Sequence, residues 1–448
     1  MQNQSIEFSA LNEPLPQVNK NLFSVVFLVT LVTALALLNF SAYVIGMIGV
    51  LIFLVGVYNF PELGVGLFVN GLFLVGYFWK GLGVTFLITP LAVVLCTMGL
   101  VHYIWNNGLK WRFGILPAIV LLIGVLLFIG ILYSPLPAQG LVKTGRYLSM
   151  NLFIFFAIML FTGDLNKLKN LLKIIAFIGF VIAIISIIYI GFIGLRNISR
   201  FTLPGQNAIW FARGLGISVL ATFFWMEFTQ KKFQKLVFIA FVCLMLSLIY
   251  LTASRGPLLA LLGVLVFYFL ILQRGKYNLF KTIFLVFLIS LSLKLIVSVA
   301  SGQIFHRMLS LFTRFDLTTF LRLQAFHKAE TLFFNNPILG VGTGGFEHFS
   351  ILVYPHNVFL ELASELGILG VMAFIIMIIY AIFLGFRLLR SQKDSTLALN
   401  LSKVFLALLF FSLINSQISG DISGNYELWF SVAGIWTLYS TKERLLKR

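Results

Sequence analysis

The segment PHNVFLELASELGILG, residues 355–370, carries the side chains whose types and spacing best suit acid–base chemistry. Asn357, Glu361 and Glu365 recur every four residues, so a helix would place them on one face. His356 stands beside them at the predicted helix start, and histidine has an ordinary pKa suited to taking a proton from a hydroxyl group near neutral pH. The alternative is structural: the two carboxylates pair with arginines, and the histidine caps or packs.

Three arginines occupy positions where a simple turn or a lipid-facing helix does not need one. Arg255, in LTASRGPLLALL, lies between two long apolar runs, and Pro257 suits the first turn of a new helix. Arg200 precedes a Pro-Gly turn, and Arg213 falls about two turns into the helix that follows, too deep to lack a partner. Planar guanidinium groups bind phosphate oxygens bidentately, so these residues suit a phosphate-bearing ligand. For Arg255 the alternative is a turn with a snorkelling side chain.

The segment INSQISGDISGNYELWF, residues 414–430, adds Asp421 in a Ser- and Gly-rich turn, where a polar turn is the alternative interpretation. No metal site is predicted, because HExxH, CxxC and Asp-x-Asp patterns do not occur and the other histidines are scattered. ATP hydrolysis is not predicted either, because the sequence has no Gly-rich phosphate loop.

The composition places these residues in a membrane protein. The chain is 60% hydrophobic and 10% charged, whereas about a quarter of residues are charged in soluble domains. We therefore predict an all-α, polytopic integral membrane protein with about 12–14 transmembrane helices. The predicted spans are 22–39, 41–58, 63–79, 84–104, 113–133, 147–163, 168–194, 206–228, 234–253, 255–273, 279–300, 357–386, 400–418 and 426–440.

The distribution of basic residues predicts the orientation. With both termini in the cytoplasm, about twenty of the 32 Lys and Arg residues lie on the inner side, so the formal charge of +18 reflects membrane topology and predicts no nucleic-acid partner. The predicted parts are a cytoplasmic tail (1–20), transmembrane helices (21–300), an outer segment (301–355), and transmembrane helices with a cytoplasmic C-terminus (356–448). The outer segment contains Arg322 and two predicted amphipathic helices, 305–317 and 318–336, the second ending at Asn335, Asn336 and Pro337.

Three motifs together resemble the bacterial O-antigen ligase and O-antigen polymerase family: SRG at 254–256, NNPILGVGTGGF at 335–346, and PHNVFLELASELGILG. The segment SGDISGNYELWF resembles a closing motif common among the polymerases of that family. The motifs cover about residues 198–430, and the first ~190 residues match only as an array of spans. The turn after Arg200 reads PGQN, where many relatives have a Pro-Asn pair.

The resemblance implies a glycosyltransferase of the bacterial plasma (inner) membrane that needs no cofactor and acts on the periplasmic or extracellular side. Its donor would be an oligosaccharide on undecaprenyl pyrophosphate. For a polymerase, which the Asp421 motif favours, the acceptor would be another lipid-linked repeat unit; for a ligase, it would be lipid A core or protein. His356 would be the base or would orient the acceptor, and Glu361 would orient His356 or pair with an arginine. The expected pyrophosphate ligands are Arg255, Arg200, Arg213 and Arg322, with Asn357, Glu365 and Asp421 in support.

A lipid-linked glycan flippase or another transporter is the alternative from a different class. Transporters carry ionisable groups near the bilayer midplane and often have repeated halves. Here the candidate charges gather at the predicted outer boundary, and no repeat of period 20–50 occurs in the sequence. A peptidoglycan-type polymerase is a nearer alternative, against which the SRG and PHN motifs argue.

Overall fold

The computed structural model describes most of the chain from residue 113 onward. The predicted spans 22–39, 41–58 and 279–300 and nearly all of the predicted helix 305–317 lie outside the described residues. The predicted spans 63–79 and 84–104 are described only in part. The described residues are 59–66, 68–69, 97, 100–106, 108, 113–194, 198–204, 206–272, 317–391 and 395–445.

The secondary structure of the described residues is helical throughout, which confirms the predicted all-α membrane class. Seven helices in these ranges are long and apolar enough to cross a membrane. The elements are α5 (Ile115–Ile131), α6 (Pro137–Arg146), the π-helical turn η2 (Tyr147–Leu152), α7 (Phe153–Met159), α8 (Leu165–Ile193), α9 (Ala208–Glu227), α10 (Lys232–Leu251), α11 (Arg255–Phe267), the π-helical turn η4 (Tyr268–Leu272), α14 (Leu317–Asn335), α15 (Phe346–Phe349), α16 (Val358–Ser391), α17 (Thr396–Ser416) and α18 (Tyr426–Leu445).

The helix bounds agree with the predicted spans to within a few residues, with one larger difference. The predicted span 147–163 begins ten residues earlier, at Pro137, and runs as one helix through α6, η2 and α7 to Met159. The polar residues of PAQGLVKTGR argue against burial in a bilayer, which is why the sequence predicts a loop there. Lys143 is nevertheless buried, because two carboxylates of α16 neutralise it.

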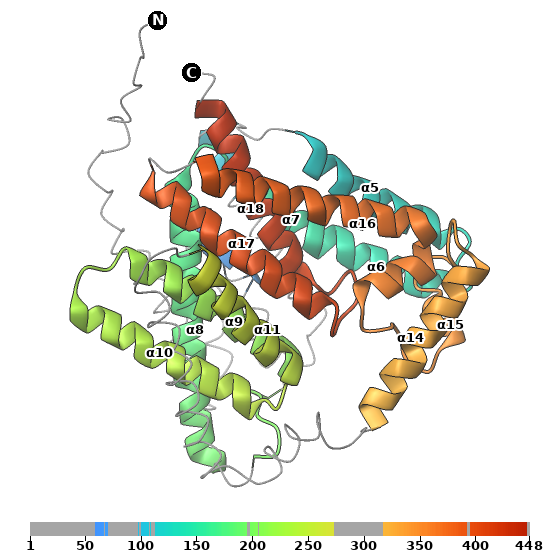
Figure 1. Cartoon of the computed structure of the whole chain (residues 1–448), viewed down its shortest axis with the longest axis horizontal. Coiled ribbons are helices and arrows are strands. Elements are labelled where there is room, and N and C mark those ends of the chain that lie inside the picture. The colour runs from blue at the N-terminus through green and yellow to red at the C-terminus, as the bar shows by residue number, and fades with distance from the viewer. Residues whose placement is uncertain are drawn as a thin grey trace, which may run out of the picture.

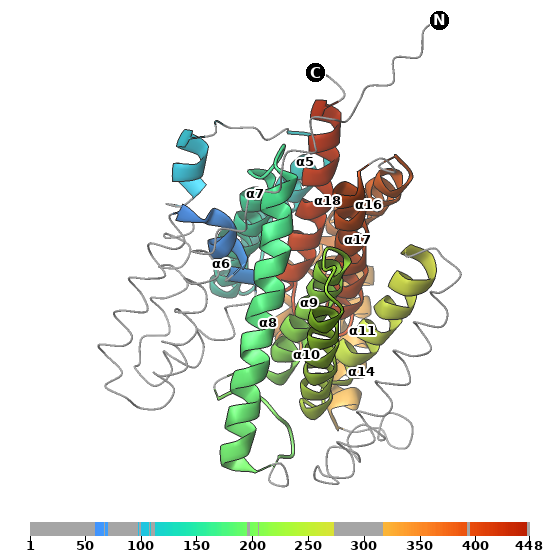
Figure 2. The same cartoon turned by 90° about the vertical axis from the view of Figure 1, so that its left-hand side faces the viewer.

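Helices α16, α17 and α18 run side by side, and α5 lies along α16 (Figure 1). The long helix α8 packs along α9 and α10 over much of the height of the molecule (Figure 2). Small residues allow close approach between these helices: a Cβ added at Gly179 of α8 would lie 2.3 Å from the Cβ of Ser218 in α9. Likewise, the ring of Phe411 in α17 packs directly over Gly216 of α9.

Helix α14 corresponds to the predicted second amphipathic helix, and it lies across the end of the bundle, against α16 (Figure 1). Ala325, Ala329 and Leu332 recur at helical spacing, and they are buried in a small cluster with Phe346. The helix ends at Asn335, immediately before the asparagine and proline that predict its end. The chain then enters the Gly-rich segment 337–345.

Helix α16 is broken within the span. Gly367 has φ 62° and ψ −155°, so an N-terminal part from Val358 and a C-terminal part to Ser391 meet at a kink. A break at membrane depth leaves backbone groups without helical partners, which is costly unless protein supplies them. The Gly-rich segment does so: Val341 N donates to the Ser364 carbonyl at 2.8 Å, and Ile368 N donates to the Pro337 carbonyl at 2.8 Å.

Close packing explains why glycines line both sides of this junction. Gly340 has φ 67°, and a Cβ there would lie 2.4 Å from the carbonyl carbon of Glu365. A Cβ at Gly367 would lie 2.4 Å from the carbonyl carbon of Ile338. Both positions combine a left-handed backbone with contact against rigid main chain, so each requires glycine.

We predict that Gly367→Ala lowers the stability of the protein by about 2–4 kcal/mol, because it adds both backbone strain and a clash with the main chain. The measurement is the midpoint of thermal unfolding of the purified protein in detergent. The matched control is Gly263→Ala in α11, where an added Cβ meets no atom within 4 Å. Equal midpoints for the two variants would contradict this account of the break.

Candidate functional site

The turn 415–425, which joins α17 to α18, is where the predicted site residues meet. Its backbone carbonyls accept hydrogen bonds from side chains of elements far apart in the sequence. Arg322 of α14 donates from Nη1 to Ile418 at 3.3 Å. Asn357, at the start of α16, donates from Nδ2 to Gln417 at 3.3 Å. The start of α11 also packs here, because Gly256 lies against the side chain of Ile418.

Arg255 ends a second turn, 251–255, which lies beside the first, and Arg200 bonds to this turn. Arg255 is the first residue of α11. Arg200 donates from Nε to the carbonyl of Thr252 at 3.3 Å, and Phe201 N donates to the carbonyl of Leu251 at 2.8 Å. Ala253 has φ 50°, so this turn is strained as well as tied to the segment before α9. The structure therefore brings the predicted arginines 200 and 255 to the same turn.

His356 lies immediately before α16, within electrostatic range of Arg322, Arg213 and Asp421. Its backbone has φ 60°, a conformation uncommon for residues other than glycine, and its ring packs edge-on against Tyr354 at 4.6 Å. The Nδ1 atom is buried with no hydrogen-bond partner. Burial, together with the positive charges of Arg322 and Arg213, lowers the pKa of His356 to about 4, against the opposing effect of Asp421. The imidazole is therefore neutral near pH 7.

Arg213 is buried in α9 and does have the partners that its depth requires. Nη1 donates to Asn425 Oδ1 at 2.6 Å and to Glu427 Oε1 at 2.8 Å, and Nη2 donates to the carbonyls of Asn415 at 2.6 Å and Ser419 at 2.7 Å. Both terminal nitrogens are thus bound to protein acceptors. Arg213 holds the turn 415–425 in shape and adds a positive charge near His356.

The carboxylate of Asp421 is held within its own turn. Ser423 Oγ donates to Oδ2 at 2.5 Å, and Gly424 N donates to Oδ1 at 2.9 Å. These contacts correspond to the polar-turn interpretation of Asp421. The side chain of Asn357 also has a local function, because its Oδ1 accepts from Leu360 N at 3.1 Å and so caps the first turn of α16.

Glu361 and Glu365 share one buried cation, Lys143 of α6. Lys143 Nζ lies 2.7 Å from Glu361 Oε1 and 2.7 Å from Glu365 Oε1, and all three side chains are almost completely buried. Backbone N–H groups satisfy the remaining oxygens: Ile422 N donates to Glu361 Oε2 at 2.8 Å, and Gly344 N donates to Glu365 Oε2 at 2.9 Å. The carboxylates therefore face protein rather than lipid, and their cation is a lysine rather than an arginine.

Lys143 was missed in the sequence analysis although a signal for it exists. The segment SPLPAQGLVKTGR, residues 134–146, lies on the predicted outer side, where the orientation rule expects few basic residues. Lys143 and Arg146 are therefore exceptions of the same kind as Arg255. The pairing itself joins residues more than 200 positions apart, so spacing along the chain does not predict it.

We predict that Lys143→Met destabilises the protein by about 3–5 kcal/mol, because it leaves two carboxylates buried without their cation. The triple variant Lys143→Met, Glu361→Gln, Glu365→Gln should recover most of that loss, since it removes the charges together. Thermal unfolding in detergent measures both effects, with Arg390→Gln, an exposed cation at the other end of α16, as the control for loss of one positive charge. A single variant as stable as the wild type would contradict the role given to the cluster.

Comparison with known proteins identifies the family of the segment that holds most of this site. A search of curated protein sequences found no match for the chain. Residues 239–375 match the family described as O-antigen ligase, a range that includes Arg255, α14, His356 and both carboxylates of the ion cluster. The turn 415–425 lies beyond it. The resemblance predicted from the sequence motifs is therefore confirmed: residues 239–375 are similar to the O-antigen ligase family.

Proposed function

We propose that the protein transfers a glycan from undecaprenyl pyrophosphate to an acceptor hydroxyl at the outer face of the bacterial inner membrane, and that it polymerises lipid-linked repeat units. The observation that carries the proposal is the position of neutral His356 near Arg322 and Arg213. Arg322 bonds to the turn 415–425, against which the start of α11, with Arg255, also packs. A base next to several guanidinium groups suits a reaction whose leaving group is an anion.

The reaction joins the acceptor oxygen to the anomeric carbon of the donor glycan. The bond between that carbon and the pyrophosphate oxygen breaks, and its electron pair leaves with the pyrophosphate. The acceptor hydroxyl loses its proton to His356, which is neutral and therefore able to accept it. Negative charge grows on the leaving oxygens in the transition state, where preorganised cationic donors stabilise it most.

Three arginines are the proposed ligands of pyrophosphate: Arg255, Arg200 and Arg322. The hydrogen bonds of Arg200 to Thr252 and of Arg322 to Ile418 support this role, because they hold the two guanidinium groups on the turns 251–255 and 415–425 before the substrate arrives. Arg213 is assigned a positioning role, since Asn425, Glu427 and two carbonyls occupy its terminal nitrogens. Its charge still contributes to the field around His356.

Glu361 and Glu365 act through Lys143 rather than on the substrate. The cluster connects α16, which begins just after His356, to α6, to the Gly-rich segment and to the turn 415–425. It thereby fixes the distance between His356 and the turn that Arg322 contacts. Asn357 supports the same arrangement by bonding Gln417.

Ligation of the lipid-linked glycan to lipid A core or protein is the second candidate. The description of the matching family favours it. The Asp421 carboxylate, whose motif favours a polymerase, is bound within its own turn and so adds no separate support for polymerisation.

We predict that His356→Ala and Arg255→Lys each reduce transfer by about 100–1,000-fold, because each removes a group that acts in the transition state. The measurement is the ladder of glycan lengths, and the molecule to which the glycans are attached, in a deletion strain complemented with each variant. Arg390→Lys is the matched control for Arg255→Lys, and membrane levels of every variant are compared by immunoblot.

Single repeat units in the deletion strain, with no ladder restored by either site variant, support a polymerase. Long chains that accumulate on the lipid carrier in the deletion strain and in both site variants identify the ligase. Full complementation by both site variants would show that these residues do not form the site.

The pH dependence provides an independent prediction. Because burial lowers the pKa of His356 to about 4, the free enzyme keeps a neutral base throughout the range from pH 5 to 8. The acid limb of kcat/KM should therefore lie near pH 4 and not near the ordinary histidine value of about 6.5. The limb of kcat should lie at higher pH, since the bound pyrophosphate favours imidazolium. A kcat/KM limb near 6.5 would contradict the environment assigned to His356.

A further inference from the structure

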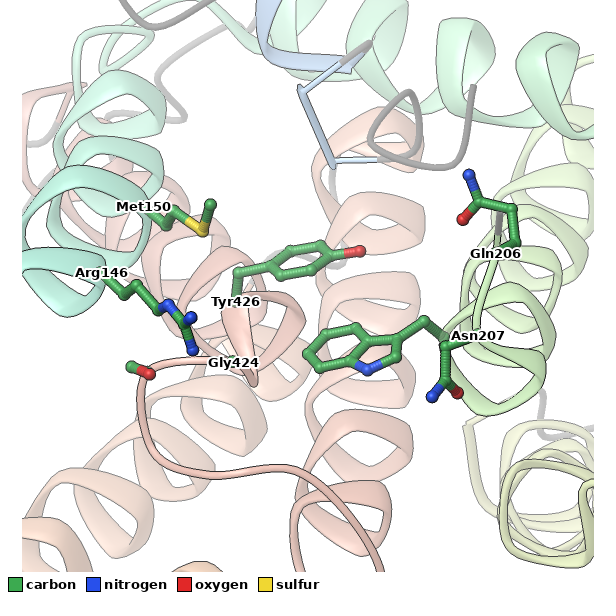
Figure 3. A pocket seen from close by; sticks show the side chains of 8 residues that line it. Arg146, Met150, Gln206, Asn207, Gly424 and Tyr426 are labelled. Atoms are coloured by element: carbon green, nitrogen blue, oxygen red, sulfur yellow. The ribbon is translucent and has the colours of Figure 1, made fainter. Parts of the chain in front are cut away.

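A cavity of about 290 Å³ lies beside the turn 415–425, and it contains none of the residues assigned to the reaction. It opens between the end of α6, the start of α9 and the start of α18 (Figure 3). Its volume is near the lower end of the range of small-molecule sites, the size expected for one sugar rather than a lipid chain. The lining residues are Arg146, Met150, Gln206, Asn207, Trp210, Ser423, Gly424 and Tyr426.

Arg146 gives the cavity a positive charge that has no protein counter-ion among the described residues. It is the last residue of α6 and lies inside the candidate membrane span Pro137–Met159. Its guanidinium points toward Gly424 and Tyr426 (Figure 3). Lys143, one turn earlier, is neutralised by two carboxylates, whereas no lining residue of the cavity is acidic. An ionisable group within a span indicates a functional partner, and for an arginine that partner is an anion.

A second group in the cavity also lacks a protein partner. The Nε2 atom of Gln206 is buried and forms no hydrogen bond in the structure. A buried donor left unsatisfied costs about 1–3 kcal/mol, so a ligand that supplies an acceptor would be favoured. The Arg146 guanidinium and the Gln206 amide are both hydrogen-bond donors, so they suit a ligand rich in acceptor oxygens.

The aromatic wall of the cavity suits a sugar ring. Tyr426 stacks on Trp210 with ring centroids 5.7 Å apart and an interplanar angle of 11°. The guanidinium of Arg213 lies over the Trp210 ring at 5.3 Å. The buried Arg213 side chain therefore supports the stack. The C–H groups of a pyranose carry slight positive charge and pack favourably on the negative faces of such rings.

We propose that this cavity binds an acidic sugar, a pyranose that carries a carboxylate, within the lipid-linked glycan. Arg146 binds the carboxylate, Gln206 donates to a ring or hydroxyl oxygen, and the Trp210–Tyr426 stack contacts the apolar edge of the ring. The inference rests on the proposed function, since it places one sugar of that substrate. The cavity shares Ser423 and Gly424 with the turn that Arg322 and Asn357 also contact, so the proposed sugar site and the proposed reaction site adjoin the same turn.

The test is direct binding of glucuronate and glucose to the full chain in lipid nanodiscs, measured by saturation-transfer NMR. We expect glucuronate to bind more tightly than glucose, and Arg146→Gln to weaken glucuronate binding at least tenfold while it leaves glucose binding nearly unchanged. Arg146→Lys should retain part of the preference, and Gln206→Ala should weaken both sugars. Arg390→Gln, which removes the same charge from the far end of α16, should have no effect.

Two results would overturn the proposal: glucuronate binding that Arg146→Gln leaves unchanged, or displacement of glucuronate from the wild type by inorganic pyrophosphate. The second would assign the cavity to the phosphates of the carrier. His356→Ala and Arg255→Lys should still bind glucuronate like the wild type. Failure of the proposed transfer reaction would therefore appear in the glycan ladders, and failure of this inference would appear in sugar binding.

Discussion

The ammonium group of Lys143, enclosed by two carboxylates, is the interaction on which the arrangement of the site depends. In a medium of low dielectric constant an isolated charge is strongly unfavourable, so the three side chains are held together by the cost of separating them. Glu361 and Glu365 also bind the amides of Ile422 and Gly344. One cluster therefore joins α6, α16, the Gly-rich segment and the turn between α17 and α18.

The break in α16 is the second constraint, and it is connected to the ion cluster through the Gly-rich segment. The Gly-rich segment supplies the hydrogen bonds that Gly367 interrupts, and the same segment binds Glu365 through Gly344. Thr343 extends the connection to α5, since its backbone N donates to Gly130 and its Oγ1 donates to Leu127. The backbone hydrogen bonds and the ion cluster thus stabilise the same junction, and both hold the N-terminal part of α16, which begins just after His356.

The helical framework could be predicted because apolar runs of this length must satisfy their backbone internally in a bilayer. The end of α14 at Asn335 and the start of α11 at Arg255 were predictable for local reasons, namely a following proline and a proline in the first turn. Other features depend on partners distant in sequence. The charged segment of α6 enters the span only because Glu361 and Glu365 neutralise Lys143, so the predicted span began ten residues too late.

In the candidate site, too, some features could be predicted from local sequence and others depend on partners distant in sequence. The residue types of His356 and the arginines indicated their chemistry, and their placement beside helix starts indicated a common surface. The partners of Arg213 come from α17, the turn and α18, and no spacing rule connects them with α9. The kink at Gly367 could not be predicted from the sequence either, because ELGILG is compatible with a continuous apolar helix. Only the contact with Ile338 and Leu339 explains the backbone conformation of Gly367.

The kink has a mechanical consequence for a protein that works in a bilayer. The part of α16 before the kink is about ten residues long, or roughly 15 Å, against roughly 30 Å for the hydrocarbon core of a bilayer. The part of α16 after the kink, up to Ser391, exposes apolar side chains such as Ile379 and Phe383, and changes in bilayer thickness alter the tilt of such segments. A continuous helix would carry that tilt directly to its first residue. Because the junction at Gly367 is bonded to the Gly-rich segment, which in turn bonds to α5, the kink interrupts that direct path between the later part of α16 and His356.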